Sequence, residues 1–303
     1  MTRICKICGR KEVEPYFPGD SRVLKCLSCG TGFLDNDLVI KNLGNYYTGR
    51  DYATRDLKEE KLKIAAAGAR EVLNFISEFI EPQHKKLLDV GANAGMFVKE
   101  ANNFGFDAKG IEASSEAVNY ARNHGIPVSR FKVEDYEPSE KFDVVTVFHV
   151  LEHVKDPVLV LNKLKKWLNN SGYLAIEVPN LESHLAKRHG PSWKFIALEH
   201  IFYFSEKSLL KLLKDHGFEI IAVRKRNFEI NYLNIRKLVQ YILGAKIHRE
   251  RLKPKSFETV SEDVSRQSLS KNLVRKFLIF LINRLGRQDH ILILAKKHEK
   301  NFR

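Results

Sequence analysis

Four cysteines near the start of the chain are arranged as two pairs of candidate metal ligands. Cys5 and Cys8 form the first pair and Cys26 and Cys29 the second, with 17 residues between the pairs. Two Cys-x-x-Cys knuckles at this spacing are typical of a zinc ribbon, in which four thiolates surround one Zn²⁺. Because sulfur would fill all four coordination positions, the predicted zinc is structural and has no open position for catalysis.

A glutamate and a histidine, Glu152 and His153, come shortly after an apolar run that reaches His149. If the run is a strand of a parallel sheet, all three side chains lie at the edge where ligands bind. Histidine suits proton transfer near neutral pH because its ordinary pKa is about 6.5. The alternative is structural, with His153 hydrogen-bonded to the next loop.

A second glutamate and histidine, Glu199 and His200, follow a loop over residues 180–199. Loops at the ligand edge of a sheet commonly bind substrates. In this interpretation His200 removes a proton from the bound substrate, and Glu199 orients the histidine ring and stabilises the imidazolium that forms. The alternative is a histidine packed in the core beside Phe202.

A glycine-containing turn over residues 87–95 is a candidate cofactor site. Gly91 would let the backbone approach a ligand, and Gly95 would allow a helix to pack closely on a strand. Asn93 lies between them, and the third glycine of the Gly-x-Gly-x-x-Gly fingerprint of dinucleotide sites is missing. The pyrophosphate of NAD needs a bare helix N-terminus, whereas S-adenosylmethionine (SAM) has no phosphate and tolerates Asn93 there. We therefore predict that this turn binds SAM and not NAD, through Gly91, Ala92, Asn93 and Gly95.

Two carboxylates flank this turn. Glu112 ends the next predicted strand, where a carboxylate can accept hydrogen bonds from both ribose hydroxyls. Asp89 precedes the turn and could hold the ammonium of the methionine moiety directly or through water; its alternative role is to brace the loop.

Strands and helices must alternate to position these residues. The alternation favours an α/β, Rossmann-like, doubly wound and mostly parallel seven-stranded sheet, with the small zinc ribbon at the N-terminus. The expected strands are 86–90, 107–112, 127–133, 142–150, 172–178, 218–224 and 290–295. The expected helices are 61–80, 94–104, 114–124, 157–168 and 205–216.

This pattern divides the chain into five parts. We expect the ribbon over residues 1–34, a connector and helix over 35–84, and the SAM-binding domain over 85–227. A basic helical insertion (228–288) and a final strand with a tail (289–303) complete the chain.

Residues 87–224 resemble class I SAM-dependent methyltransferases. The resemblance is carried by Leu-Asp-Val-Gly-Ala-Asn-Ala-Gly from residue 87, Gly-Ile-Glu-Ala-Ser from 110, Phe-Asp-Val-Val from 142, Val-Leu-Glu-His-Val from 150 and Gly-Tyr-Leu-Ala-Ile-Glu-Val-Pro-Asn from 172. The cysteine-rich start and Glu-His-Ile-Phe-Tyr-Phe-Ser from 199 are similar to bacterial enzymes of surface-polysaccharide and sugar biosynthesis, including sugar C-methyltransferases.

The resemblance implies roles for further residues. A contact to the adenine of SAM maps to Glu134 or Asp135; the alternative is that both are solvated acids of a loop.

A related group of enzymes that methylates quinone rings on oxygen holds a divalent metal with the motif Glu-x-x-Glu-His. In this chain His149 takes the place of the first glutamate, so this metal is not expected. Similar sugar enzymes use the pair at Glu199 and His200 for proton transfer; the tyrosine that some of them place just before it is absent, which leaves O-methylation open.

The chain carries a formal net charge of +14, which favours an anionic partner. The insertion holds 13 Lys/Arg against 5 Asp/Glu, a net of +8. Residues 272–287 place basic residues on both sides of an apolar centre, like an interfacial helix on an anionic membrane, although a helix that caps the sheet is the alternative. RNA is a lower-ranked partner because charge is its only signature. Without a signal peptide or a membrane span, we expect a cytoplasmic protein, peripheral at most at the inner face of the membrane.

These observations together predict a SAM-dependent methyltransferase that acts on a nucleotide-linked or lipid-linked sugar. Two other interpretations stay open: a methyltransferase of tRNA or rRNA, and a non-catalytic nucleic-acid-binding protein built on the zinc ribbon.

Overall fold

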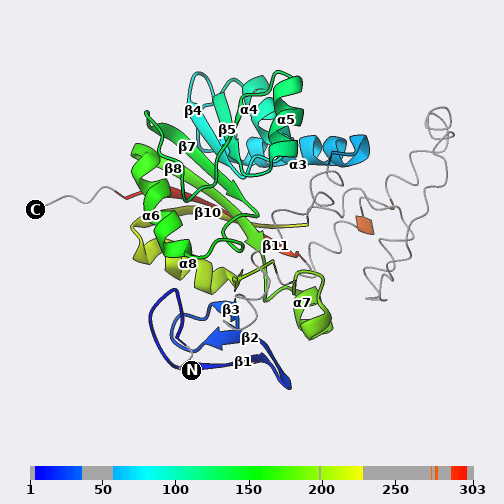
Figure 1. Ribbon diagram of the computed structural model, residues 1–303, viewed down its shortest axis with the longest axis vertical. Helices are drawn as coiled ribbons and strands as arrows, with labels where there is room; N and C mark the ends of the chain where they lie inside the picture. The colour runs from blue at the N-terminus through cyan, green and yellow to red at the C-terminus, as the bar shows by residue number, and fades with distance from the viewer. Residues whose placement is uncertain are drawn as a thin grey trace, which may run out of the picture.

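A computed structural model of the chain describes residues 4–35, 57–197, 199–227, 274, 277–278 and 288–298. The main element is a seven-stranded sheet in the order β10-β11-β8-β7-β4-β5-β6 (Figure 1). Only β11 runs antiparallel to its neighbours, β8 and β10, and the other neighbouring strands are parallel. The predicted α/β fold with a mostly parallel seven-stranded sheet is confirmed. The strands are β4 (Lys86–Val90), β5 (Asp107–Glu112), β6 (Val128–Arg130), β7 (Phe142–Phe148), β8 (Leu168–Pro179), β10 (Phe218–Arg226) and β11 (His290–Lys297).

Helices cover both faces of this sheet (Figure 1). One hydrophobic cluster joins α3, α4 and α5 to the sheet, and a second joins α6 and α8 to its other side. Side-chain caps fix several helix starts: Ser114 accepts the amide of Ala117, and Asp156 accepts the amide of Leu159. The helices are α3 (Glu59–Ser77), α4 (Met96–Asn103), α5 (Ser115–Asn123), α6 (Pro157–Trp167), α7 (His184–His189) and α8 (Glu206–Asp215), with a 3₁₀ turn η1 (Gly190–Ser192).

The four cysteines lie in a small separate sheet, which we call the cysteine ribbon (residues 4–35). Its strands are β1 (Val13–Phe17), β2 (Asp20–Cys26) and β3 (Gly32–Leu34). A fourth strand of the same sheet, β9 (Phe202–Tyr203), comes from much later in the sequence. Buried residues of the ribbon belong to the same hydrophobic cluster as the α6 and α8 side of the main sheet. The ribbon is therefore packed onto the larger fold rather than tethered beside it.

Some predicted elements differ in extent. The strand expected over 127–133 ends at Arg130, and the one expected to reach residue 150 ends at Phe148, because His149 takes a left-handed conformation (φ 57°) that a strand cannot continue. The loop expected over 180–199 contains α7 and η1. Residues 36–56 of the connector lie outside the described residues, as does most of the 228–288 insertion, including the predicted interfacial helix apart from residues 274, 277 and 278.

Candidate functional site

The turn after β4 has the backbone that the glycine pattern predicts. Gly91 (φ 78°) and Gly95 (φ 79°) both have left-handed φ angles, and Asn93 shares this conformation (φ 48°). A side chain at Gly91 would collide with Val150, and one at Gly95 would meet Ile126 at 2.7 Å. Glycine is therefore required at both positions, on steric as well as conformational grounds.

Glu112 stands at the end of β5 and faces this turn. Its Oε2 accepts the amide of Asn93 at 2.9 Å, and its Oε1 accepts the amide of Ser114 at 2.8 Å. Each carboxylate oxygen has a second lone pair, so both can still accept a hydroxyl. The carboxylate is thus held in a fixed orientation beside the turn, as a ligand for two vicinal hydroxyls requires.

Asp89 lies beneath the turn. It is 3% exposed, and its Oδ1 accepts a 2.7 Å hydrogen bond from Thr146 Oγ1. Burial raises the pKa of this carboxyl to about 7. This position supports the bracing role; a contact between Asp89 and the ammonium of SAM stays a prediction.

The remaining predicted cofactor ligands are Ala92, Glu134 and Asp135. Ala92 is buried within the turn, and its amide donates to the carbonyl of Ile111 at 3.0 Å. Glu134 and Asp135 are exposed, beyond the end of β6. The position is open to a ligand, and the adenine contact stays a prediction.

His149 is held between two buried carboxylates at the end of β7. Its Nε2 lies 3.1 Å from Glu177 Oε1, and its Nδ1 lies 3.5 Å from Glu152 Oε1. Burial alone would lower the pKa of this imidazole, but its contacts with Glu152 and Glu177 raise the pKa to about 10. His149 is therefore an imidazolium at neutral pH and has no lone pair with which to act as a base.

Glu152, His153 and His200 meet at the same edge of the sheet. One ligand atom from each lies within 4.8 Å of the others. Glu152 is 1% exposed and His200 is 8% exposed. Within the described part of the chain, neither carboxylate oxygen of Glu152 accepts a hydrogen bond, apart from the 3.5 Å ion pair of Oε1 with His149, and His200 Nδ1 has no hydrogen-bond partner. Buried polar atoms without hydrogen bonds are costly, so this cluster indicates a binding or catalytic role.

The two histidines of this cluster have different surroundings. Burial lowers the pKa of His200 to about 4, although the nearby charge of Glu152 opposes the shift. His153 Nδ1 lies 2.8 Å from the carbonyl oxygen of Glu199, which can only accept, so Nδ1 is the donor of this hydrogen bond. The imidazole of His200 is thus held neutral by burial, with a nitrogen lone pair that can accept a proton.

Comparisons with known proteins identify the fold. A sequence model described as a methyltransferase domain matches residues 61–223, which is more than half of the chain. The chain belongs to this methyltransferase domain family. Its structure is similar to a SAM-dependent methyltransferase from Archaeoglobus fulgidus (TM-score 0.53, 18% identity, covering 82% of this chain and 100% of that one). It is also similar to phosphoethanolamine N-methyltransferase 2 of Haemonchus contortus (TM-score 0.52, 15% identity, covering 82% and 60%).

The similar curated proteins are named ubiquinone biosynthesis O-methyltransferase. The protein from Actinobacillus pleuropneumoniae serotype 7 is 32% identical over 108 residues, or 32% of this chain and 46% of that protein. The protein from Proteus mirabilis is 32% identical over 117 residues, or 36% and 48%. The chain thus spans about half the length of the curated relatives it matches. The prediction of a SAM-dependent methyltransferase is confirmed at the level of the domain.

These names contradict the predicted sugar acceptor and the assignment to polysaccharide biosynthesis, because they describe O-methyl transfer to a small molecule. The structure gives a physical reason for the error. The segment from Glu199 to Ser205 that resembles the sugar enzymes forms β9, which pairs with the cysteine ribbon, and Ser205 caps α8. Phe202, Tyr203 and Ser205 of this segment thus have roles in folding, which do not depend on a sugar substrate.

The structure places a different carboxylate beside His200 from the one that precedes it in the sequence. No described hydrogen bond or ion pair joins the carboxylate of Glu199 to His200; Glu199 contributes its backbone carbonyl to His153. Glu152, on the loop after β7, lies in one cluster with His200, and its charge raises the pKa of that ring more than the charge of Glu199 does. A role of Glu199 in proton transfer stays a prediction.

Sequence reasoning missed the ion pairs behind His149. Glu177 on β8 lies 3.3 Å from Arg226 at the end of β10, and both are buried. His290, at the start of β11, packs edge-on against His149 with ring centroids 5.0 Å apart. Glu177 could have been found as an isolated charge in the apolar run from Leu174 to Val178. Its partners could not, because they become neighbours only through the order of strands in the sheet.

Within the described ranges, no helix is long and apolar enough to cross a membrane.

Proposed function

We propose that this protein transfers the methyl group of SAM to a hydroxyl oxygen of a small-molecule acceptor. The observation that carries the proposal is the cluster of buried Glu152 and His200 with half-buried His153, at the same sheet edge as the cofactor turn. The O-methyltransferase names of the relatives support oxygen as the atom methylated. The sulfonium already activates the methyl group, so the protein has to place the hydroxyl in line and remove its proton.

In this mechanism His200 accepts the proton. The neutral imidazole takes the hydroxyl proton as the oxygen attacks the methyl carbon; the carbon–sulfur bond breaks and S-adenosylhomocysteine is released. Glu152 faces the resulting imidazolium and stabilises its charge. His149 keeps its own positive charge between Glu152 and Glu177 and takes no part in proton removal.

A screen for the acceptor tests the proposal. Methyl-labelled SAM is incubated with a panel of phenols, enols, aliphatic alcohols, amines and nucleotide sugars, and both S-adenosylhomocysteine and the labelled product are measured. We expect label on oxygen in at least one hydroxyl compound. Transfer only to nitrogen or to carbon would show that the proposed chemistry is wrong.

The same cluster favours a second route to an activated hydroxyl. Two imidazole nitrogens and one carboxylate within 4.8 Å form a donor set that suits a divalent transition metal, and the hydrogen bond from His153 to Glu199 is typical of a ligand held by an outer contact. Such a metal would lower the pKa of a bound hydroxyl. Loss of activity in a chelator, with recovery on adding Mn²⁺ or Zn²⁺, would assign His200 as a ligand rather than a base.

We also propose that the cysteine ribbon holds one structural zinc ion. The four sulfurs lie within 4.8 Å of one another, with Cys5–Cys29 at 3.6 Å and Cys8–Cys26 at 3.5 Å. These separations are too long for disulfide bonds and close to the ~3.8 Å expected between thiolates that share a tetrahedral zinc at ~2.3 Å. Amides of Gly9 and Gly30 donate back to Cys5 and Cys26, which closes the two knuckles.

Elemental analysis of the purified protein is therefore expected to give one zinc per chain. A Cys26→Ser variant should bind less than one equivalent and unfold at a lower temperature, because metal binding contributes to folding free energy. Ser28→Ala, next to a ligand position but without sulfur, is the matched control and should retain its zinc. Protein grown with ample metal that contains no zinc would contradict this assignment.

A further inference from the structure

Residues 190–203, which carry His200, are bound to the cysteine ribbon at both ends. The structure describes all of them except residue 198. Side chains from this segment and from the ribbon are members of one hydrophobic cluster. We call it the His200 segment.

The carboxyl end of the His200 segment is a strand of the ribbon's own sheet. Gly32 of β3 lies opposite Tyr203 of β9, and the amide of Leu34 donates a 2.8 Å hydrogen bond to the carbonyl of Ile201. A side chain at Gly32 would approach Tyr203 at 3.1 Å, so the two strands are in close contact. Because Ile201 directly follows His200, the ribbon fixes the backbone beside the histidine.

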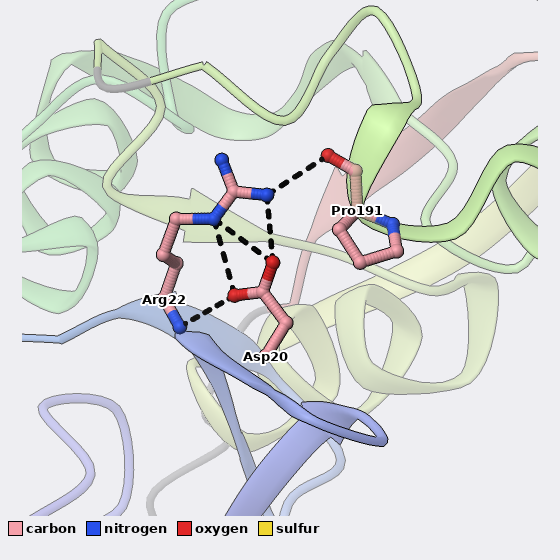
Figure 2. A network of polar contacts seen from close by, with 3 residues as sticks. All are labelled: Asp20, Arg22 and Pro191. Atoms are coloured by element: carbon pink, nitrogen blue, oxygen red, sulfur yellow. Dashed lines mark hydrogen bonds and ion pairs between the residues drawn. The ribbon is translucent and has the colours of Figure 1, made fainter.

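The amino end of the segment is held by Arg22 of β2, as Figure 2 shows. The guanidinium of Arg22 donates a 3.2 Å hydrogen bond from Nη2 to the carbonyl of Pro191. Asp20 orients this guanidinium through two short contacts, 2.9 Å to Nε and 2.7 Å to Nη2. A planar fork held by a carboxylate in this way is pre-organised for a third acceptor.

A line of contacts leads from this anchor to the catalytic ring. The amide of Trp193 donates to the carbonyl of Gly190 at 3.0 Å. Trp193 packs edge-on against Phe195, with ring centroids 5.0 Å apart. Phe195 is stacked on His200 with an interplanar angle of 13° and a centroid separation of 6.1 Å. A shift at Pro191 would therefore reach the imidazole through packed rings.

We propose that Arg22 is a positioning residue for methyl transfer: it anchors the His200 segment to the cysteine ribbon and so sets the place of the His200 ring. The inference rests on the proposed function for the role of His200, and it adds the ribbon as a part of the acceptor side of the site. The ribbon thereby does more than stabilise the fold, because it contacts the segment both before His200, at Pro191, and after it, at Ile201 and β9.

Arg22→Ala is the variant that tests this role, and Arg10→Ala is its matched control. Arg10 is also an exposed arginine of the ribbon, but no described contact joins its side chain to the His200 segment. Hydrogen exchange of the full protein, followed by mass spectrometry, measures the amides of residues 190–203 without any acceptor. We expect exchange there to be ~2- to 5-fold faster in Arg22→Ala, the range for losing one exposed charged contact, and unchanged in Arg10→Ala.

Turnover with the acceptor found in the screen provides the second readout. We expect kcat to fall ~3- to 10-fold in Arg22→Ala, since small misplacements of a catalytic group are costly, while the Kd for SAM stays unchanged. Arg22→Lys keeps a positively charged donor group but lacks the planar fork. Its kcat should fall between those of Arg22→Ala and the unmodified protein. Partial rescue by lysine distinguishes positioning from a general loss of stability.

Several results would overturn the inference. Unchanged exchange at residues 190–203 in Arg22→Ala would do so, and so would equal acceleration in Arg10→Ala, which would show a charge effect without a specific contact. Faster exchange with normal kcat, in a protein whose His200→Ala variant is inactive, would reject the positioning role and leave the proposed function intact. Normal turnover in His200→Ala would instead reject the proposed function, and the exchange result would still decide whether Arg22 holds the segment.

Discussion

Replacement of His200 by alanine is expected to lower kcat by ~10²–10⁴-fold, the usual contribution of general acid–base catalysis. The reason is that the variant lacks the imidazole that accepts the hydroxyl proton in the proposed mechanism. Among the described residues of the cluster, His200 is the buried histidine, and it lies beside the carboxylate of Glu152. SAM affinity should be nearly unchanged because Glu112 and the Gly91 turn lie on the cofactor side. Steady-state kinetics and calorimetric titration with SAM measure the two effects separately.

The pH dependence provides an independent check on this role. Because burial lowers the pKa of His200 to about 4, the ring stays neutral and kcat/KM should be flat from pH 7 down to about 5, then fall as the ring is protonated. The same shift affects stability. Between pH 6.5 and about 4 the unfolded histidine binds a proton that the folded one does not, so the free energy of unfolding decreases as pH falls through this window.

His124→Ala is the matched control, since His124 is exposed at the end of α5 and its ring contacts Tyr120, away from the Glu152 cluster. It should retain normal kcat. Near-normal turnover in His200→Ala would remove the assignment and direct attention to His153.

The second large effect is expected on cofactor binding. Glu112→Gln should weaken SAM by ~1.5–3 kcal/mol, or roughly 10- to 150-fold in Kd, the range for hydrogen bonds to a charged group. The amide cannot accept on both sides, so it loses one of the two backbone contacts that now orient the carboxylate, from Asn93 and Ser114. Calorimetry with SAM measures the change.

Glu116→Gln is the control for this experiment, because Glu116 is exposed and its carboxylate contacts Ser114 and Ser115 rather than the turn. It should bind SAM normally. A Glu112→Gln protein with unaltered affinity for SAM would mean that the ribose hydroxyls are held elsewhere. Binding of NAD instead of SAM by the unmodified protein would remove the basis of the prediction altogether.

The cofactor turn and the cysteine cluster could be predicted from the sequence because their signals are local. The sharp turn from β4 into α4 requires glycine at positions 91 and 95, and Cys5 and Cys8 can reach one metal because only two residues separate them. The caps at Ser114 and Ser205 are local in the same sense: each serine accepts an amide three residues further on, and α5 and α8 begin at the next residue.

The composition of the candidate catalytic cluster depends on tertiary structure. Adjacency in sequence paired Glu199 with His200, whereas the loop after β7 brings Glu152 into the cluster with this histidine. The charge states of the histidines depend on tertiary structure as well. His149 and His200 have the same side chain, yet two carboxylates keep one protonated and burial keeps the other neutral.

The sequence thus predicted the main strands and helices of the large sheet, their order and the glycine turn after β4, because hydrophobic periodicity and turn glycines act over a few residues. Only the tertiary structure decided that the ribbon's β3 pairs with β9, that Arg22 reaches Pro191, and that Glu177 meets Arg226. The physical reason is that each of these contacts joins segments far apart in the chain. Its existence depends on strand order and on packing across the sheet, and no local pattern encodes either of these.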